Sequence, residues 1–372
     1  MTGGYAGSNI KFYTLEHITM KKRKKSLLVR LSCSMSRLAL LAFCGMMMNA
    51  CSNDEQEIPG CILPPEYSYN CMCPDFLKQG DTIAIVSPSY VTSDENIEKG
   101  MDVIRSWGFV PIKAPNLNQE YLSRYAGTIA QRAADLEWAY KNPQVKAIMC
   151  TRGGYGTIQL LDVLPSDIYI KYPKWLVGYS DITTLLSASV TSRVMCIHGT
   201  MLTSLVNTQG TADDDKQLVK LLKGDIPHYS WQTEFDNKTG TAQGILVGGN
   251  LCTLAPIIGT DYDFTSRGEI ILFIEEIGEN ARNIDRILYS LKVHGALSRV
   301  KGIITGDFYA NGDEFNIGNI EDMIRKYTYQ DVNIPIAHGF HAGHAGVNYP
   351  LIMGAHVTLN VTSHQATLDF EL

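Results

Sequence analysis

The stretch TIAIVSPSYVTSDENIEKGMDVIRSWGFVPIKAP, residues 82–115, alternates two hydrophobic patterns. A short run rich in Ile and Val over 82–88 predicts a buried strand, a longer helical pattern over 94–109 predicts a helix, and 110–115 predicts the next strand. A strand, a helix and a strand in this order are typical of parallel sheets whose faces are covered by helices. The stretch therefore indicates the α/β class.

The same alternation continues towards the C-terminus. Further helices are predicted over 129–142 and 181–192, and further strands over 145–150 and 175–179. We therefore expect residues 75–205 to form an N-terminal domain with a Rossmann-like parallel sheet. Residues that bind ligands in such sheets lie beyond the carboxyl ends of the strands.

A second domain of mixed α/β structure is predicted over 241–372. Its expected elements are a helical segment at 250–259, a strand at 269–276, a helix at 280–295, and strands at 300–308, 355–361 and 365–372. The residues between the two domains, 206–240, are interpreted as a polar connector, and the acidic run inside them as a solvated surface. Residues 1–51 are interpreted as a signal segment and 52–74 as a linker.

Composition and charge narrow the classes of partner. The 372 residues are 45% hydrophobic and 19% charged, which is typical of a soluble globular protein. The formal net charge is −6, and no basic stripe occurs in the body of the chain. Nucleic acid is therefore not the expected partner, and small or neutral ligands fit better.

The N-terminal segment resembles a bacterial lipoprotein signal. A basic region is followed by an apolar run over 38–48 and by MNAC, which would make Cys51 the lipidated residue. The apolar run is too short to span a bilayer, which takes about 20 residues. Ser52 favours the outer membrane as the destination, so we expect a membrane-anchored lipoprotein of the periplasm or outer membrane. Met20 and Met35 are alternative start positions.

The cysteines beyond the signal segment fall into two groups. Those in the Pro-rich linker could form a disulfide outside the cytosol: Cys61, Cys71 and Cys73. Those in apolar stretches have no partner at metal-binding spacing and are predicted to be packed core thiols: Cys150, Cys196 and Cys252.

Ser180 stands in LVGYSDITTLL, residues 176–186, between an apolar strand and the first turn of a helix. It could be an N-cap, whose hydroxyl accepts from free backbone N–H groups, or a nucleophile presented on a tight turn. The loop after the previous strand, TRGGYG, contains Gly153, Gly154 and Gly156. Its backbone N–H groups could face a cleft, as in oxyanion holes, although a structural turn would need the same glycines.

Two further stretches carry titratable side chains. The strand ILFIEE ends in Glu275 and Glu276, and strand alternation predicts that one enters a cleft while the other is solvated. The glycine-rich HGFHAGHAG contains His338, His341 and His344. Their spacing invites a zinc interpretation with Glu275 as a further ligand, whereas the simpler interpretation is hydrogen-bonded loop histidines.

These stretches supply a serine, a carboxylate and a histidine in that order. A serine hydroxyl needs a histidine base to become a good nucleophile, and the histidine needs a carboxylate to hold its tautomer. The chain therefore contains the parts of a Ser–His–Glu hydrolase. Their order alone does not establish one, because triads recur in several chain orders.

Five blocks in sequence order resemble the LD-carboxypeptidase family, the serine peptidases of family S66. The blocks, which lie between Pro74 and the C-terminus, are RGGYG, GYSDIT, GGNL, LFIEEIGE, and GH followed by N and P. The resemblance implies a triad of Ser180, Glu275 and His344 in a catalytic cleft between the two domains. It also implies an oxyanion hole built from the backbone N–H groups of Gly154 and Asp181.

Other residues in these blocks receive different roles. Asn250, in the GGN block, is expected to be a structural or substrate-side residue. Only His344 matches the histidine of the family, so the resemblance implies neither a metal nor an organic cofactor. Glu275 is preferred over Glu276 and Glu279 because it is the first carboxylate after the apolar strand and matches the family block.

The activity implied by the resemblance is removal of the terminal D-alanine from cell-wall tetrapeptides. The expected partners are a muropeptide substrate, a membrane reached through the lipid anchor, and a second copy in a homodimer. Two alternatives stay open. The chain could be an immunity peptidase of the same family that cleaves a peptide-nucleotide antibiotic, or a lipid-anchored muropeptide-binding protein without turnover.

Overall fold

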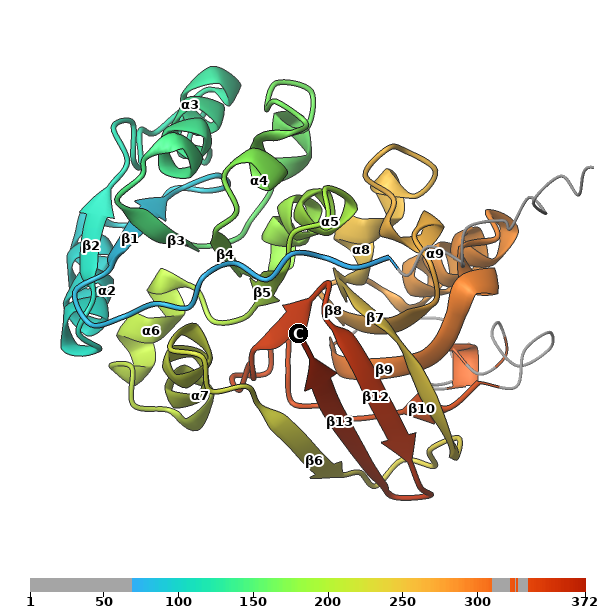
Figure 1. The fold of residues 1–372 in the computed structure, drawn as a ribbon. Helices are drawn as coiled ribbons and strands as arrows, with labels where there is room; N and C mark the ends of the chain where they lie inside the picture. The colour runs from blue at the N-terminus through green and yellow to red at the C-terminus, as the bar shows by residue number, and fades with distance from the viewer. Residues whose placement is uncertain (1–68, 310–321, 325, 327–333) are drawn as a thin grey trace, which may run out of the picture. The chain divides into compact units, whose positions relative to one another are not determined.

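The computed structural model describes residues 69–309, 322–324, 326 and 334–372 (Figure 1). The predicted signal segment, its Cys51 and the linker cysteine Cys61 lie outside these residues. Within the described ranges, no helix combines the length and the apolar character needed to cross a membrane.

The first sheet has six strands in the order β11-β5-β4-β3-β1-β2. Its strands are β1 (Thr82–Val86), β2 (Val110–Lys113), β3 (Val145–Cys150), β4 (Trp175–Gly178), β5 (Cys196–His198) and β11 (Leu351–Met353). Strands β1 to β5, blue to light green in Figure 1, pair in parallel, and β11 joins β5 antiparallel. The order 2-1-3-4-5 is that of flavodoxin-like sheets and differs from the 3-2-1-4-5-6 order of the Rossmann fold.

Helices join the strands of this sheet. They are α2 (Asp94–Ser106), α3 (Ile129–Lys141), α4 (Ile168–Lys171), α5 (Thr183–Thr191), α6 (Leu202–Thr208) and α7 (Asp213–Leu222), with 3₁₀ turns η1 (Thr157–Leu160) and η2 (Ser180–Ile182). Side-chain caps explain where the longest two begin. Ser93 accepts from the amide of Asn96 at the start of α2, and Thr128 forms a capping box with Gln131 at the start of α3.

The second sheet has seven strands in the order β10-β9-β8-β7-β12-β13-β6. Its strands are β6 (His228–Gln232), β7 (Gly240–Asn250), β8 (Ile270–Ile277), β9 (Val300–Tyr309), β10 (Ile336–Ala337), β12 (His356–Val361) and β13 (Gln365–Glu371). Strands β7 to β10 are parallel, whereas β12, β13 and β6 are antiparallel, so this sheet contains both kinds of pairing. The accompanying helices are α8 (Leu251–Leu254), α9 (Ala281–Val293), η3 (Ala255–Ile257), η4 (Phe264–Ser266) and η5 (Ala296–Arg299).

Two domain boundaries differ from the prediction. Residues 206–240 are not a plain connector, because they contain α7 and β6, and β6 pairs with β13 at the edge of the second sheet. Residues 241–372 do not form the second sheet alone, because β11 leaves them to pair with β5 of the first. The acidic run is solvated only at Asp213, since Asp214 and Asp215 are buried at the start of α7.

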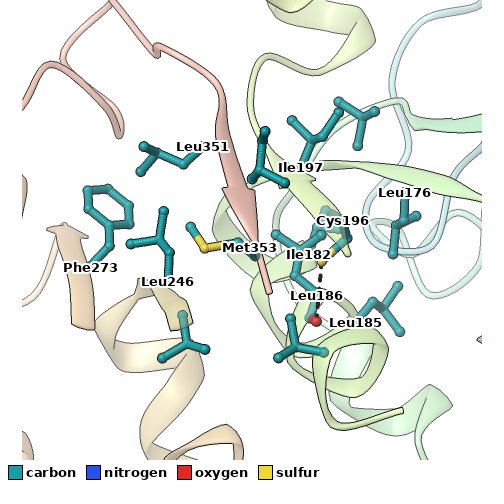
Figure 2. Close-up of a cluster of buried hydrophobic side chains, with 14 of the residues drawn as sticks. Leu176, Ile182, Leu185, Leu186, Cys196, Ile197, Leu246, Phe273, Leu351 and Met353 are labelled. Atoms are coloured by element: carbon teal, nitrogen blue, oxygen red, sulfur yellow. Dashed lines mark hydrogen bonds between the residues drawn. The ribbon is translucent and has the colours of Figure 1, made fainter. Parts of the chain in front are cut away.

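The two sheets share one hydrophobic core (Figure 2). Leu351 and Met353 of β11 lie in Figure 2 between side chains of β7 and β8, such as Phe273, and side chains of α5 and β5, such as Ile197. Residues 66–372 accordingly form one compact unit. This common core holds the carboxyl end of β4 in a fixed position relative to that of β8.

The cysteine predictions are confirmed in part. Cys150 and Cys196 are fully buried core thiols, but Cys252 is only half-buried. Cys71 and Cys73 are both free thiols, so they are not paired with each other.

Candidate active site

Ser180 occupies a strained turn directly after β4. Its φ of 62° lies in the left-handed region, which costs a non-glycine residue about 1 kcal/mol or more. The N-cap interpretation is wrong, because no backbone N–H at the start of η2 or α5 donates a capping hydrogen bond to a side chain. Within the described part of the chain the Ser180 hydroxyl makes no hydrogen bond, so it is available to react.

The loop after β3 touches this hydroxyl. A Cβ atom added at Gly153 would lie 2.9 Å from the Ser180 Oγ, so only glycine fits there. Across the described ranges, the amides of Gly154 and Asp181 donate no hydrogen bond. Two N–H groups near the hydroxyl are therefore free to bind an oxygen atom.

The Asp181 side chain fixes the loop rather than facing a substrate. It is buried and accepts from the hydroxyl of Ser89 at 2.7 Å and from the amide of Thr157 at 3.1 Å. Burial raises the pKa of this carboxyl. Arg132, also buried, donates to the Gly156 carbonyl at 3.0 Å and so ties the loop to α3.

Glu275 and His344 form the second half of the site. The Nδ1 of His344 donates to the Oε2 of Glu275 at 2.7 Å, and the carboxylate is fully buried. Burial raises the pKa of Glu275, and the hydrogen bond from His344 opposes that shift. A Cβ atom at Gly343 would lie 3.0 Å from the Glu275 Oε2, so glycine allows this close approach. Because Nδ1 carries the proton in this bond, Nε2 of the neutral imidazole is the nitrogen that can accept a proton.

Neighbours of Ser180 connect the two halves. The Tyr179 ring lies 5.0 Å, centroid to centroid, from the His344 ring. The amide of Asn250, which pairs with Glu275 across β7 and β8, donates to the Thr183 hydroxyl at 3.2 Å. The structure thus joins His344 to the predicted Glu275 by a hydrogen bond and places the His344 ring against Tyr179, the residue before Ser180.

Two family models match the chain: the LD-carboxypeptidase N-terminal domain over residues 83–199 and the LD-carboxypeptidase C-terminal domain over 243–359. The chain belongs to the LD-carboxypeptidase family. The region that matches the N-terminal model contains Ser180, and the region that matches the C-terminal model contains Glu275 and His344. The members of this family are peptidases, so the site described above is the candidate active site of a peptidase.

Relatives and solved structures agree with this family assignment. The protein slr1534 of Synechocystis sp. is 33% identical over 317 residues, which cover 81% of this chain and 98% of the relative. The crystal structure of muramoyltetrapeptide carboxypeptidase from Oxalobacter formigenes is 25% identical, with a TM-score of 0.71 and coverage of 78% of this chain and 99% of that one. The microcin C7 self immunity protein MccF, at 22% identity, a TM-score of 0.70 and coverage of 81% and 99%, shares the fold.

Glu276 of this LD-carboxypeptidase family member is not solvated, contrary to the strand-alternation prediction. It is buried and accepts from the amide of Cys252 at 2.6 Å and from the side chain of Asn250 at 3.3 Å. Asn250 in turn caps α8 by accepting from the amide of Thr253. Both residues therefore hold the start of α8, and the Asn250 side chain is structural.

Burial raises the pKa of Glu276 from its ordinary 4.5 to about 7. Between these values the folded protein holds a proton that the unfolded chain releases, so the free energy of unfolding falls as pH rises. We expect Glu276→Gln, which cannot ionise, to gain stability relative to the wild type between pH 5 and pH 8, by at most about 3 kcal/mol. Urea titrations at both pH values measure this difference, with Glu269→Gln as the control for charge removal. A stability difference independent of pH would contradict the assignment.

The histidine-rich stretch separates into different environments. His338 is buried with its Nδ1 3.1 Å from the Thr305 hydroxyl, and His341 is exposed. Among the residues the structure describes, no group of three or more His, Cys, Asp or Glu side chains is placed to hold a metal ion. The zinc interpretation therefore has no ligand set in these residues.

Sequence reasoning missed the residues that hold the His344 loop. The side-chain oxygen of Asn348 accepts from the Gly343 backbone amide at 3.0 Å, and the backbone N–H of Asn348 donates to the Asp214 carboxylate at 2.8 Å. Asp307 accepts from the Ala345 amide at 2.9 Å. The N of the last family block was the available signal for Asn348, but no pattern indicated Asp214 or Asp307.

Proposed function

We propose that this chain is a serine carboxypeptidase that hydrolyses the L,D-amide bond of cell-wall tetrapeptides and releases the terminal D-alanine. The observation that carries the proposal is the buried Glu275–His344 hydrogen bond beside the strained and unbonded Ser180. The likeness to a solved muramoyltetrapeptide carboxypeptidase supports the choice of substrate.

In the proposed mechanism, His344 Nε2 accepts the proton of Ser180 as the hydroxyl oxygen attacks the carbonyl carbon. The amides of Gly154 and Asp181 stabilise the oxyanion, and the buried Glu275 stabilises the imidazolium. His344 then gives the proton to the departing amine, which leaves as D-alanine. Water repeats these steps on the acyl-enzyme and frees the serine.

Incubation of the purified protein with a muramyl tetrapeptide tests the proposal directly. Release of D-alanine and formation of the tripeptide is the expected result. Absence of both products, with cleavage of a peptide-nucleotide antibiotic instead, would favour the immunity peptidase, whose fold MccF shares. Tetrapeptide binding without turnover, and without fluorophosphonate labelling of Ser180, would favour a binding protein.

We also propose that Cys51 is lipidated and anchors the protein outside the cytosol, in keeping with the basic and apolar segments before it. Cys51→Ser is expected to move the protein from the membrane to the soluble fraction and to change its apparent mass. Fractionation and mass spectrometry of whole cells measure both. An unchanged distribution and mass would refute the anchor. The expected homodimer is checked by light scattering of the released protein.

A further inference from the structure

The strand order of the first sheet reverses between β1 and β3, next to β4, which precedes Ser180. The connections from β1 and β3 leave the sheet in opposite directions, since β1 leads to β2 and β3 leads to β4 on the other side. Ligands of open α/β sheets bind at such a switch point, beyond the carboxyl ends of the two strands. Arg152 follows β3 at this point, and Val91 follows β1.

Arg152 presents an exposed cation there. Its guanidinium donates to the Gly153 carbonyl at 3.3 Å and to the Val91 carbonyl at 3.4 Å, both at the long end of hydrogen-bond distances. In the described ranges it forms no ion pair with a carboxylate. Arg132 differs, because it is buried and donates to Pro88, Gly127, Gly156 and Gln159.

A carboxypeptidase has to recognise a carboxylate close to its nucleophile, and a guanidinium is one group that can bind it. The carbon of the terminal carboxylate is three bonds, roughly 3–4 Å, from the carbonyl carbon under attack. Arg152 is bonded to Gly153, whose Cα faces the Ser180 hydroxyl. The acids of the site, buried Glu275 and half-buried Asp307, would repel an anionic substrate unless a cation offset their charge.

We propose that Arg152 binds the terminal carboxylate of the peptide and thereby restricts this site to the last residue of a chain. The inference rests on the proposed function and identifies the terminal carboxylate as the substrate group that Arg152 recognises. A guanidinium suits this role, because its planar fork donates two parallel hydrogen bonds to a carboxylate. A peptide that continues beyond the cleaved bond has a neutral amide in that position and leaves Arg152 without its partner.

The test compares two muramyl tetrapeptides that differ only in a free carboxylate or a carboxamide at the last residue. Binding is measured by calorimetry on the Ser180→Ala protein, so that no turnover is needed. We expect the free acid to bind about 10- to 100-fold more tightly than the carboxamide, and Arg152→Gln to remove this preference while carboxamide binding stays unchanged. Arg152→Lys should keep part of the preference, because it retains the charge without the fork.

Arg105→Gln, on the exposed end of α2, is the matched control for loss of one guanidinium and should keep the full preference. Equal binding of both peptides before any change at Arg152 would overturn the inference. An equal loss of affinity for both peptides in Arg152→Gln would also overturn the inference, since Arg152 would then bind a part of the peptide other than its terminal carboxylate. A carboxylate preference in a protein that releases no D-alanine would support the subsite and refute the proposed hydrolysis.

Discussion

Ser180→Ala is expected to lower the rate of D-alanine release by about 10⁴- to 10⁶-fold. The hydroxyl of Ser180 is the proposed nucleophile, and the neighbouring Thr183 hydroxyl is already engaged with the Asn250 amide. Triad members act as a unit, so the single change should cost nearly as much as replacement of Ser180, Glu275 and His344 together. The rate is measured by enzymatic detection of D-alanine from a muramyl tetrapeptide.

Ser180→Gly provides the control for folding. Glycine adopts the positive φ at this position without strain, so the free energy of unfolding of Ser180→Gly should be about 1 kcal/mol higher than that of the wild type. Its activity should be as low as that of Ser180→Ala. Thermal melts of both variants separate loss of the hydroxyl from loss of structure. Turnover at the wild-type rate in either variant would refute the nucleophile assignment.

Glu275→Gln is expected to lower the same rate by about 10³- to 10⁴-fold, less than Ser180→Ala. The Glu275 carboxylate accepts a hydrogen bond from the protonated Nδ1 of His344 at 2.7 Å and does not itself react. An amide at this position can donate to Nδ1 instead, which would place the proton on Nε2 and remove the base from Ser180. The melting temperature should change little, because glutamine fills the same buried volume.

Glu276→Gln is the neighbouring control for this experiment. Its side chain holds the amide of Cys252 and makes no contact with His344, so its variant should keep most of the activity. Full activity in Glu275→Gln with loss of activity in Glu276→Gln would assign the carboxylate of the triad to Glu276 instead of Glu275.

Local patterns were enough to predict the strands that carry the site. The apolar run before Ser180 and the one before Glu275 both form strands at the expected positions, β4 and β8. Their parallel neighbours made it predictable that both residues would lie at strand ends. The family blocks then singled out His344 from three histidines, and it is His344 that bonds to Glu275.

The contacts between distant segments could not be predicted in the same way. Strand β11 has three residues, and its partner β5 lies far away in sequence, so no hydrophobic period identifies the pair. Asp214 belongs to an acidic run that is typical of a surface, and its bonds to the backbone N–H of Asn348 and to the Thr200 hydroxyl explain its burial. The alternation rule also failed at Glu276, because α8 covers the face that the rule assigns to solvent.

The position of β11 also orders the events of biosynthesis. The strand follows the His344 loop directly and adds to a sheet whose other strands are all made before residue 200. Because β11 is the edge strand of the sheet that carries Ser180, that sheet is completed only after the His344 loop has been synthesised. A prematurely terminated product that ends before Leu351 would therefore lack a strand of the serine-bearing sheet, and one that ends before His344 would lack the base as well.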